Sequence, residues 1–178
     1  PDSKALVALL TDTIREANRL HAAVLPDWSR VNRELGLRLD RELQRWTGTA
    51  PVTAVRVKHF LIDWLSPFGT GGITLPWLQE AHLAGDLFSF ERPFIAAHEK
   101  SHLKGRTEEA EANFFAWLAC IRSDIPAVQY SGHFSLLGYL FGALPAAERA
   151  PFHKTLAPGV LAHVRLQRER ARKRSRTL

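Results

Sequence analysis

The sequence contains few of the features that would place a chain in a specialised class. Its single cysteine, Cys120, excludes an internal disulfide, and the apolar helical pattern around it predicts a small buried side chain. No hydrophobic run is long enough to cross a bilayer, since the longest are FFAWLACI (114–121) and LLGYLFGAL (136–144). No secretory signal is recognisable. These absences leave the compartment open, because an anchor that precedes Pro1 would not be seen.

Most of the chain also lacks net charge of either sign. The formal net charge is +6, but the segment 164–178 alone carries seven Lys or Arg residues and one Glu. The basic excess therefore predicts a basic C-terminal tail over residues 165–178 rather than a nucleic-acid-binding fold. Such a tail can attract nucleic acid or anionic lipid, or it can be a solvated helix end. The absence of interleaved aromatic residues weighs against nucleic acid as a partner.

The chain has the length and composition of one domain. It has 178 residues, of which 46% are hydrophobic and 24% charged, so it can bury a core and is too apolar to be disordered. We expect a single domain over residues 1–164, followed by the basic tail. Apolar periodicity predicts helices, and runs of β-branched and aromatic residues predict extended segments. The expected helices cover residues 3–25, 27–46, 93–104, 108–122 and 133–144, and the extended segments lie within 52–67 and 72–84.

One stretch, HEKSH over residues 98–102, has the spacing of a metal site. His98 and His102 are four residues apart, so their rings lie on the same face of the expected helix 93–104. Glu99 lies beside the first histidine, where a carboxylate can hold a metal-bound water rather than the metal itself. The stretch therefore predicts two ligands of Zn²⁺ with a catalytic base next to them.

A catalytic zinc site needs a third protein ligand. The expected helix 108–122 begins with three carboxylates, Glu108, Glu109 and Glu111. On a helical wheel Glu111 falls on the side that carries apolar residues, whereas Glu108 and Glu109 can be solvated. Because a buried carboxylate without a partner is unfavourable, Glu111 is predicted to be the third ligand.

Two considerations weigh against this interpretation. At this composition, H-E-x-x-H arises by chance in roughly one chain in fifty, so a solvated helix with incidental histidines is the alternative. In addition, Lys100 is basic, whereas zinc-peptidase helices usually keep the two middle positions of the motif uncharged. A lysine that points away from the metal would be compatible with activity.

The same stretch resembles a known group of proteins. HEKSH followed by EEAEANFFAWLA is similar to the zincin metallopeptidases of the gluzincin type. It is most similar to a bacterial family of unknown function with H-E-x-x-H, a glycine, E-A-N-F and a later Y-S-G. The likeness spans roughly residues 55–135, and an E-A-N-x-F-A helix in anti-repressor-type metallopeptidases supports Glu111. The matching residues are His98, Glu99, His102, Gly105, Glu111, Ala112, Asn113, Phe114, Tyr130, Ser131 and Gly132.

The resemblance implies both a fold and a location. The expected fold is α+β, a mostly helical zincin-like metallopeptidase domain with a small sheet packed on the HExxH helix. Members of the similar family usually have transmembrane helices before the catalytic domain. This chain would then be the soluble part of a membrane-associated protein whose N-terminal anchor is absent here. That part would be extracytoplasmic, with the cytoplasm as the open alternative.

The resemblance also implies a mechanism for cleaving a peptide or protein substrate. His98, His102 and Glu111 would hold Zn²⁺, and Glu99 would take the proton of the attacking water. Tyr130 and His133 are the candidates for stabilising the oxyanion, since both follow the ligand helix in an expected loop. The extended segment 72–84 could align the substrate as an edge strand.

Two other functions remain open from the sequence. The first is a zinc-binding domain of this kind without catalysis, in which the metal has a structural or regulatory role. The second is a binding module that uses the basic tail.

Overall fold

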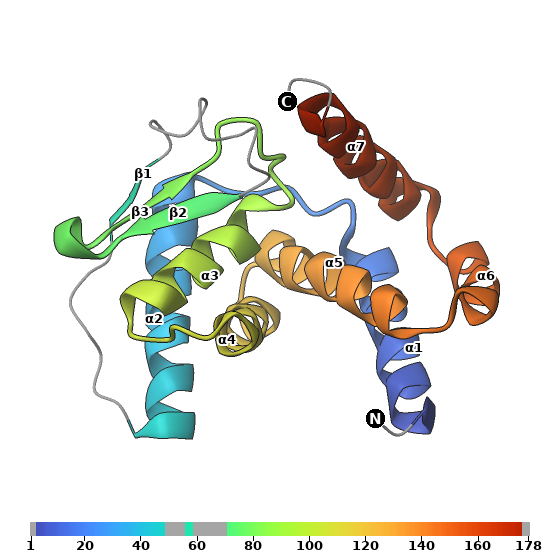
Figure 1. Ribbon diagram of the computed structural model, residues 1–178, viewed down its shortest axis with the longest axis horizontal. Coiled ribbons are helices and arrows are strands. Elements are labelled where there is room, and N and C mark those ends of the chain that lie inside the picture. The colour runs from blue at the N-terminus through green and yellow to red at the C-terminus, as the bar shows by residue number, and fades with distance from the viewer. Residues whose placement is uncertain (1–2, 49–55, 59–70, 176–178) are drawn as a thin grey trace.

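The computed structural model describes residues 3–48, 56–58 and 71–175, and this part of the chain is mostly helical with a small sheet (Figure 1). The α+β class predicted from the sequence is thereby confirmed. None of the described helices is both long and apolar enough to cross a membrane. The helices are α1 Ser3–Leu20, α2 Trp28–Thr47, α3 Arg92–Leu103, α4 Glu109–Ile121, α5 Pro126–Ala143, α6 Arg149–Lys154 and α7 Pro158–Ser175, and the strands are β1 Arg56–Lys58, β2 Gly72–Leu75 and β3 Glu80–Leu83.

Helix α2 shows how local sequence sets the helix ends. The Asp27 carboxylate accepts hydrogen bonds from the backbone N–H groups of Ser29 and Arg30, which caps the first turn. Gly48 closes the last turn in the left-handed conformation, with φ of 68°. Between these ends, leucines and a valine recur at helical spacing and are buried. The helix predicted over 27–46 is confirmed.

The sheet has three described strands in the order β1-β3-β2. Strand β1 is parallel to β3, and β2 is antiparallel to β3. The strand predicted within 52–67 corresponds to β1, and the rest of that segment lies outside the described residues. All four residues of β3 are buried, whereas β2 occupies one of the two outer positions of the described sheet and contacts α3. The sheet therefore places the backbone of β2 beside α3, the helix that contains the HEKSH stretch (Figure 1).

Helix α5 replaces a segment that the sequence suggested was a loop. The helix begins at Pro126, whose fixed φ suits the first turn, and the backbone N–H of Ile125 donates to the Ser123 hydroxyl just before it. Residues 126–132 therefore continue directly into the apolar helix predicted over 133–144. This extension brings Gly132 against α4, where a Cβ atom would lie 2.7 Å from Cβ of Cys120.

We predict that Gly132→Val lowers the free energy of unfolding by about 2 kcal/mol, because the added side chain forces α4 and α5 apart. Urea denaturation measures this change. Gly138→Val on the same helix is the matched control, since a Cβ there meets nothing within 4 Å. Equal losses of stability in the two variants would contradict the close approach of α4 and α5.

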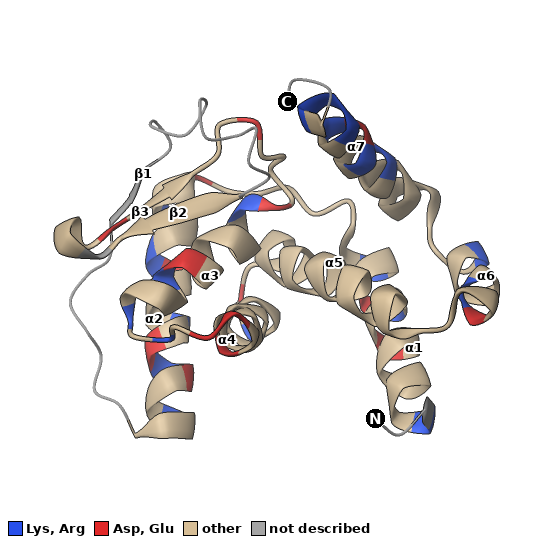
Figure 2. Cartoon of the chain, in the orientation of Figure 1, with Lys and Arg blue, Asp and Glu red and all other residues tan. Residues whose placement is uncertain are grey.

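The basic C-terminal segment is not a separate tail in the described structure. Helix α7 runs through residue 165, the predicted domain boundary, and Figure 2 shows Lys and Arg gathered towards its C-terminal end. The Arg170 guanidinium binds the buried carboxylate of Glu91, with 2.6 Å between Nη2 and Oε1, and Arg174 binds Asp86. These contacts join the end of α7 to the segment that leads into α3. Residues 165–175 are therefore part of a helix that contacts the rest of the described chain, and the domain boundary at residue 165 stays a prediction.

We predict that Arg170→Ala lowers the free energy of unfolding by about 2 kcal/mol, because it leaves the Glu91 carboxylate buried without its charged donor. Arg172→Ala is the control, since Arg172 is exposed on the same helix. Thermal or urea unfolding of the two variants gives the comparison. A loss below about 0.5 kcal/mol for Arg170→Ala would mean that the contact does not hold α7 in place.

Candidate metal centre

The two histidines of the HEKSH motif meet on one face of α3. Their Nε2 atoms are 3.1 Å apart, and the rings are perpendicular. Helix α3 supplies this arrangement because His98 and His102 are separated by one turn. Two ring nitrogens this close must share either a proton or a cation.

The third group of the cluster comes from the first turn of α4. One carboxylate oxygen of Glu109 lies 3.4 Å from Nε2 of His98, and the other lies 3.3 Å from Nε2 of His102. The Glu109 side chain is 75% exposed, so it reaches the histidines from the solvent side. Within the described residues, these three are the group of His, Cys, Asp and Glu side chains that can hold one cation.

The structure does not bring Glu111, the predicted third ligand, to the histidines. The Glu111 carboxylate instead accepts from Nη1 of Arg106 at 3.0 Å. One turn after Glu111, Phe115 packs on Leu39 and Leu43 of α2. The side of α4 that carries Glu111 is therefore directed towards α2, whereas Glu109 is on the side that faces α3.

A backbone contact orients one of the two rings. Nδ1 of His102 lies 2.7 Å from the carbonyl oxygen of Arg106, so Nδ1 carries the proton and Nε2 keeps its lone pair for the cluster. Burial lowers the pKa of His98, and the neighbouring His102 lowers it further, although Glu109 and the Asn113 side chain act in the opposite direction. A low pKa favours the neutral imidazole, which is the form that binds metals.

Glu99 points into the same cavity and is held by β2. Its Oε2 accepts a hydrogen bond of 2.6 Å from the hydroxyl of Thr74. Burial raises the pKa of Glu99, and this hydrogen bond lowers it only in part. Gly72 makes the close approach of the strand possible, because a Cβ there would lie 2.7 Å from Oε1 of Glu99. Glu99 is thus a buried carboxylate with a basicity above its ordinary value.

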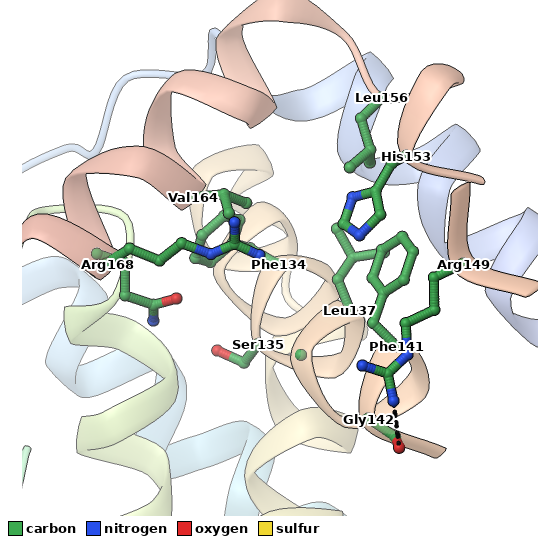
Figure 3. A pocket seen from close by; sticks show the side chains of 12 residues that line it. Phe134, Ser135, Leu137, Phe141, Gly142, Arg149, His153, Leu156, Val164 and Arg168 are labelled. Carbon is green, nitrogen blue, oxygen red and sulfur yellow. Dashed lines mark hydrogen bonds between the residues drawn. The ribbon is translucent and has the colours of Figure 1, made fainter. Parts of the chain in front are cut away.

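These groups line an open cavity of about 510 Å³. Its walls are β2 with the glycine before it, the exposed side of α3, the first turns of α4, and Tyr139 of α5. A cavity of this size is within the range of ligand-binding sites in proteins. Another cavity, of about 360 Å³ between α5, α6 and α7, shares none of these lining residues (Figure 3).

Lys100 lies on the opposite side of α3 from the cavity. Its ammonium group donates to the backbone carbonyl of Asn32 in α2 at 2.6 Å, and the side chain is buried. The glycine at position 36 leaves room for it, since a Cβ there would be 3.4 Å from Nζ. The basic residue in the middle of the motif therefore contacts α2 and not the histidine cluster.

The two residues proposed for the oxyanion do not reach the cavity. The Tyr130 hydroxyl is 2.7 Å from Nδ1 of His163, and its ring is packed in the core with Phe134. His133 is on the side of α5 that faces Glu16 of α1. The cause is the helical start of α5, which turns these side chains away from α3. Tyr130 therefore lies outside the cavity lining, and its catalytic role stays a prediction.

Tyr139 is the residue of α5 that the sequence analysis missed. It lies two and a half turns after Tyr130, lines the cavity and is more than half exposed. Burial of part of the ring raises the pKa of its phenol, and Glu109 raises it further. The available signal was a large exposed aromatic side chain in an otherwise apolar helix.

The Tyr-Ser-Gly stretch makes contacts that hold helices together. The hydroxyl of Ser131 accepts a hydrogen bond of 3.0 Å from the backbone N–H of Phe94, in the first turn of α3. This bond satisfies a backbone N–H group that the helix itself cannot pair. With the contacts of Tyr130 and Gly132, the stretch fixes α5 against α3, α4 and α7.

Fold and site together define a mostly helical α+β protein with a His-His-Glu cluster beside an outer strand. The chain matches, over residues 1–177, the family described as a protein of unknown function (DUF3810), and it belongs to that family. Neither the curated proteins nor the solved structures contain a match to it.

Proposed function

We propose that the chain is a zinc-dependent peptidase with a zincin-like catalytic domain. The observation that carries the proposal is the closeness of the three side chains. Bonds of about 2.0–2.1 Å at tetrahedral angles place neighbouring ligand atoms about 3.3 Å apart. The Nε2 atoms of His98 and His102 are 3.1 Å apart, and each has a different carboxylate oxygen of Glu109 near it, at 3.4 Å and 3.3 Å respectively. Two imidazoles and one carboxylate are also a donor set of catalytic zinc sites.

A bound Zn²⁺ would supply Lewis acidity, lowering the pKa of a water and polarising a carbonyl. Glu99 is placed to take the proton of that water, because its carboxylate lines the same cavity and its raised pKa makes it a better base. The Thr74 hydroxyl holds the carboxylate in position. Glu99 can then pass the proton to the departing amine.

Tyr139 is the candidate donor to the oxyanion in this proposal. A phenol is protonated at neutral pH at its ordinary pKa, and the pKa of Tyr139 is raised further, so its hydroxyl can donate a hydrogen bond. It also lines the cavity together with the three proposed ligands. Tyr139 takes the place for which Tyr130 and His133 were considered.

The substrate in this proposal is an extended peptide segment. Strand β2 is at one of the two outer positions of the described sheet, and Thr74 within it touches Glu99. A peptide paired with β2 would lay a carbonyl beside the cluster. A membrane anchor and an extracytoplasmic location, which the resemblance implies, stay predictions.

Metal analysis combined with a cleavage assay tests the proposal. We expect about one equivalent of zinc per chain, hydrolysis of a mixed peptide library, loss of hydrolysis on chelation, and recovery when zinc is returned. Zinc binding without cleavage of any peptide would favour the non-catalytic alternative. No zinc binding at micromolar concentration would overturn both.

A further inference from the structure

A second cavity adjoins the metal cavity and has a different chemical character. It measures about 610 Å³ and shares three lining residues with the metal cavity, namely Phe94, Asn113 and Tyr139. The two cavities are therefore neighbouring spaces on either side of a common wall. Asn113 is one helical turn after Glu109 on α4, so the wall begins directly beside the cluster.

The walls of the second cavity are almost entirely apolar. Helix α4 contributes a stripe of three residues at helical spacing in addition to Asn113. Leu9 comes from α1 and Leu136 from α5, and no lining residue is charged. Leu9 and Phe114 are each about two-fifths exposed, which is unusual for large apolar side chains gathered in one place. The α4 stripe consists of Ala110, Phe114 and Trp117.

We propose that this second cavity is the specificity pocket of the enzyme and binds a large apolar side chain, preferably aromatic, next to the scissile bond. The inference rests on the peptidase function proposed above. Successive side chains of an extended peptide point in opposite directions. A carbonyl held beside His98, His102 and Glu109 therefore directs one flanking side chain over the common wall into this space.

The size and lining of the pocket determine which side chains it favours. An aromatic ring buries far more apolar surface there than a methyl group, which leaves most of the space unfilled. A carboxylate would lose its hydration and find no cation among the lining residues. We therefore expect aromatic side chains to be favoured most, small ones less, and acidic ones least.

The test uses the zinc-loaded full chain and matched peptides. The peptides are identical except at the two positions that flank the cleaved bond, where Phe, Ala or Glu is placed in turn. We expect kcat/KM at one of these positions to be at least about tenfold higher for Phe than for Ala, and lower again for Glu. Equal values for all three residues at both positions would overturn the pocket.

Two variants alter the pocket without removing a metal ligand. Ala110→Trp fills the space from an exposed position of α4 and should reduce the preference for Phe at least about fivefold. Leu136→Glu should make a Lys side chain acceptable at the same position. Leu166→Glu on α7 is the matched control, because it makes the same exchange at a partly exposed leucine outside the pocket. Unchanged preferences in both pocket variants would contradict the proposal.

A binding measurement separates failure of this inference from failure of the proposed function. The Glu99→Gln variant is mixed with Phe, Ala and Glu peptides, and the change in tryptophan fluorescence reports binding, since Trp117 lines the pocket. Tighter binding of the Phe peptide without hydrolysis by the wild type would support the pocket and reject the peptidase. Hydrolysis without any preference would support the peptidase and reject the pocket.

Discussion

Replacing Glu109 by glutamine is expected to lower the affinity for zinc by at least about a hundredfold. Residues that only hydrogen-bond to a metal ligand cost up to about a hundredfold in metal affinity when they are replaced, and a ligand itself should cost at least as much. Glu109 is the one carboxylate within reach of both ring nitrogens among the described residues, at 3.3 and 3.4 Å. An amide lacks the negative charge that a cation requires from this position. Competition with a chromogenic chelator measures the zinc affinity directly.

Glu111→Gln is the matched control for this variant. Glu111 is in the same turn of α4, undergoes the same chemical change, and pairs with Arg106 instead of the histidines. Its zinc affinity is expected to stay within about threefold of the wild type, because only a partly exposed ion pair is lost. If Glu111→Gln lost zinc and Glu109→Gln kept it, the ligand predicted from the helical wheel would be right after all.

Glu99→Gln is expected to keep its zinc and to lose hydrolysis by about 10²- to 10⁴-fold, the usual contribution of a general base. The Gln side chain fills the same space against Gly72 and can still bond to the Thr74 hydroxyl. The fold and the ligands are therefore unchanged, and only the group that accepts the proton is absent. The measurements are zinc content by mass spectrometry and kcat/KM on the best peptide substrate.

Thr74→Val is a useful companion to Glu99→Gln. It removes the hydrogen bond to the carboxylate but leaves the base itself in place. A smaller loss, of about tenfold, is expected because the base is less firmly positioned. Full activity in Glu99→Gln would remove Glu99 from the mechanism, whatever the result for Thr74→Val.

The sequence predicted the bounds of α3 well because the residues that mark its ends lie next to those ends in the sequence. Helix α3 covers Arg92–Leu103, within one residue of the prediction, since Pro93 and Gly105 mark its ends in the sequence itself. The pairing of His98 with His102 follows from helix geometry alone. It needs no knowledge of what surrounds the helix.

The position of Glu109 beside the two histidines could not be predicted because it depends on tertiary packing. A helical wheel identifies the apolar side of α4, but that side packs on α2, through Phe115 and Ala119. The direction of α3 relative to α4 is set by the turn between them, about which the wheel says nothing. Glu109 was therefore assigned to solvent, although its exposed carboxylate closes the cluster.

The two oxyanion candidates lie away from the cavity for a related reason. The polar residues of SDIPAVQYSG suggested a loop, but Pro126 starts a helix within it. Helical geometry then turns Tyr130 into the core and brings Tyr139, two and a half turns later, to the cavity. For Lys100 the structure favours the interpretation instead. A basic residue in the middle of H-E-x-x-H weighed against a zinc site, but its side chain contacts α2 and points away from the histidines.

The short connection between α3 and α4 contributes twice to the proposed metal centre. The carbonyl of Arg106 within it orients His102, and its end fixes the position of Glu109. A single inserted residue would rotate α4 by about 100° relative to its present start and carry Glu109 away from both rings. The number of residues between the two helices, and not only their identity, therefore belongs to the definition of the site.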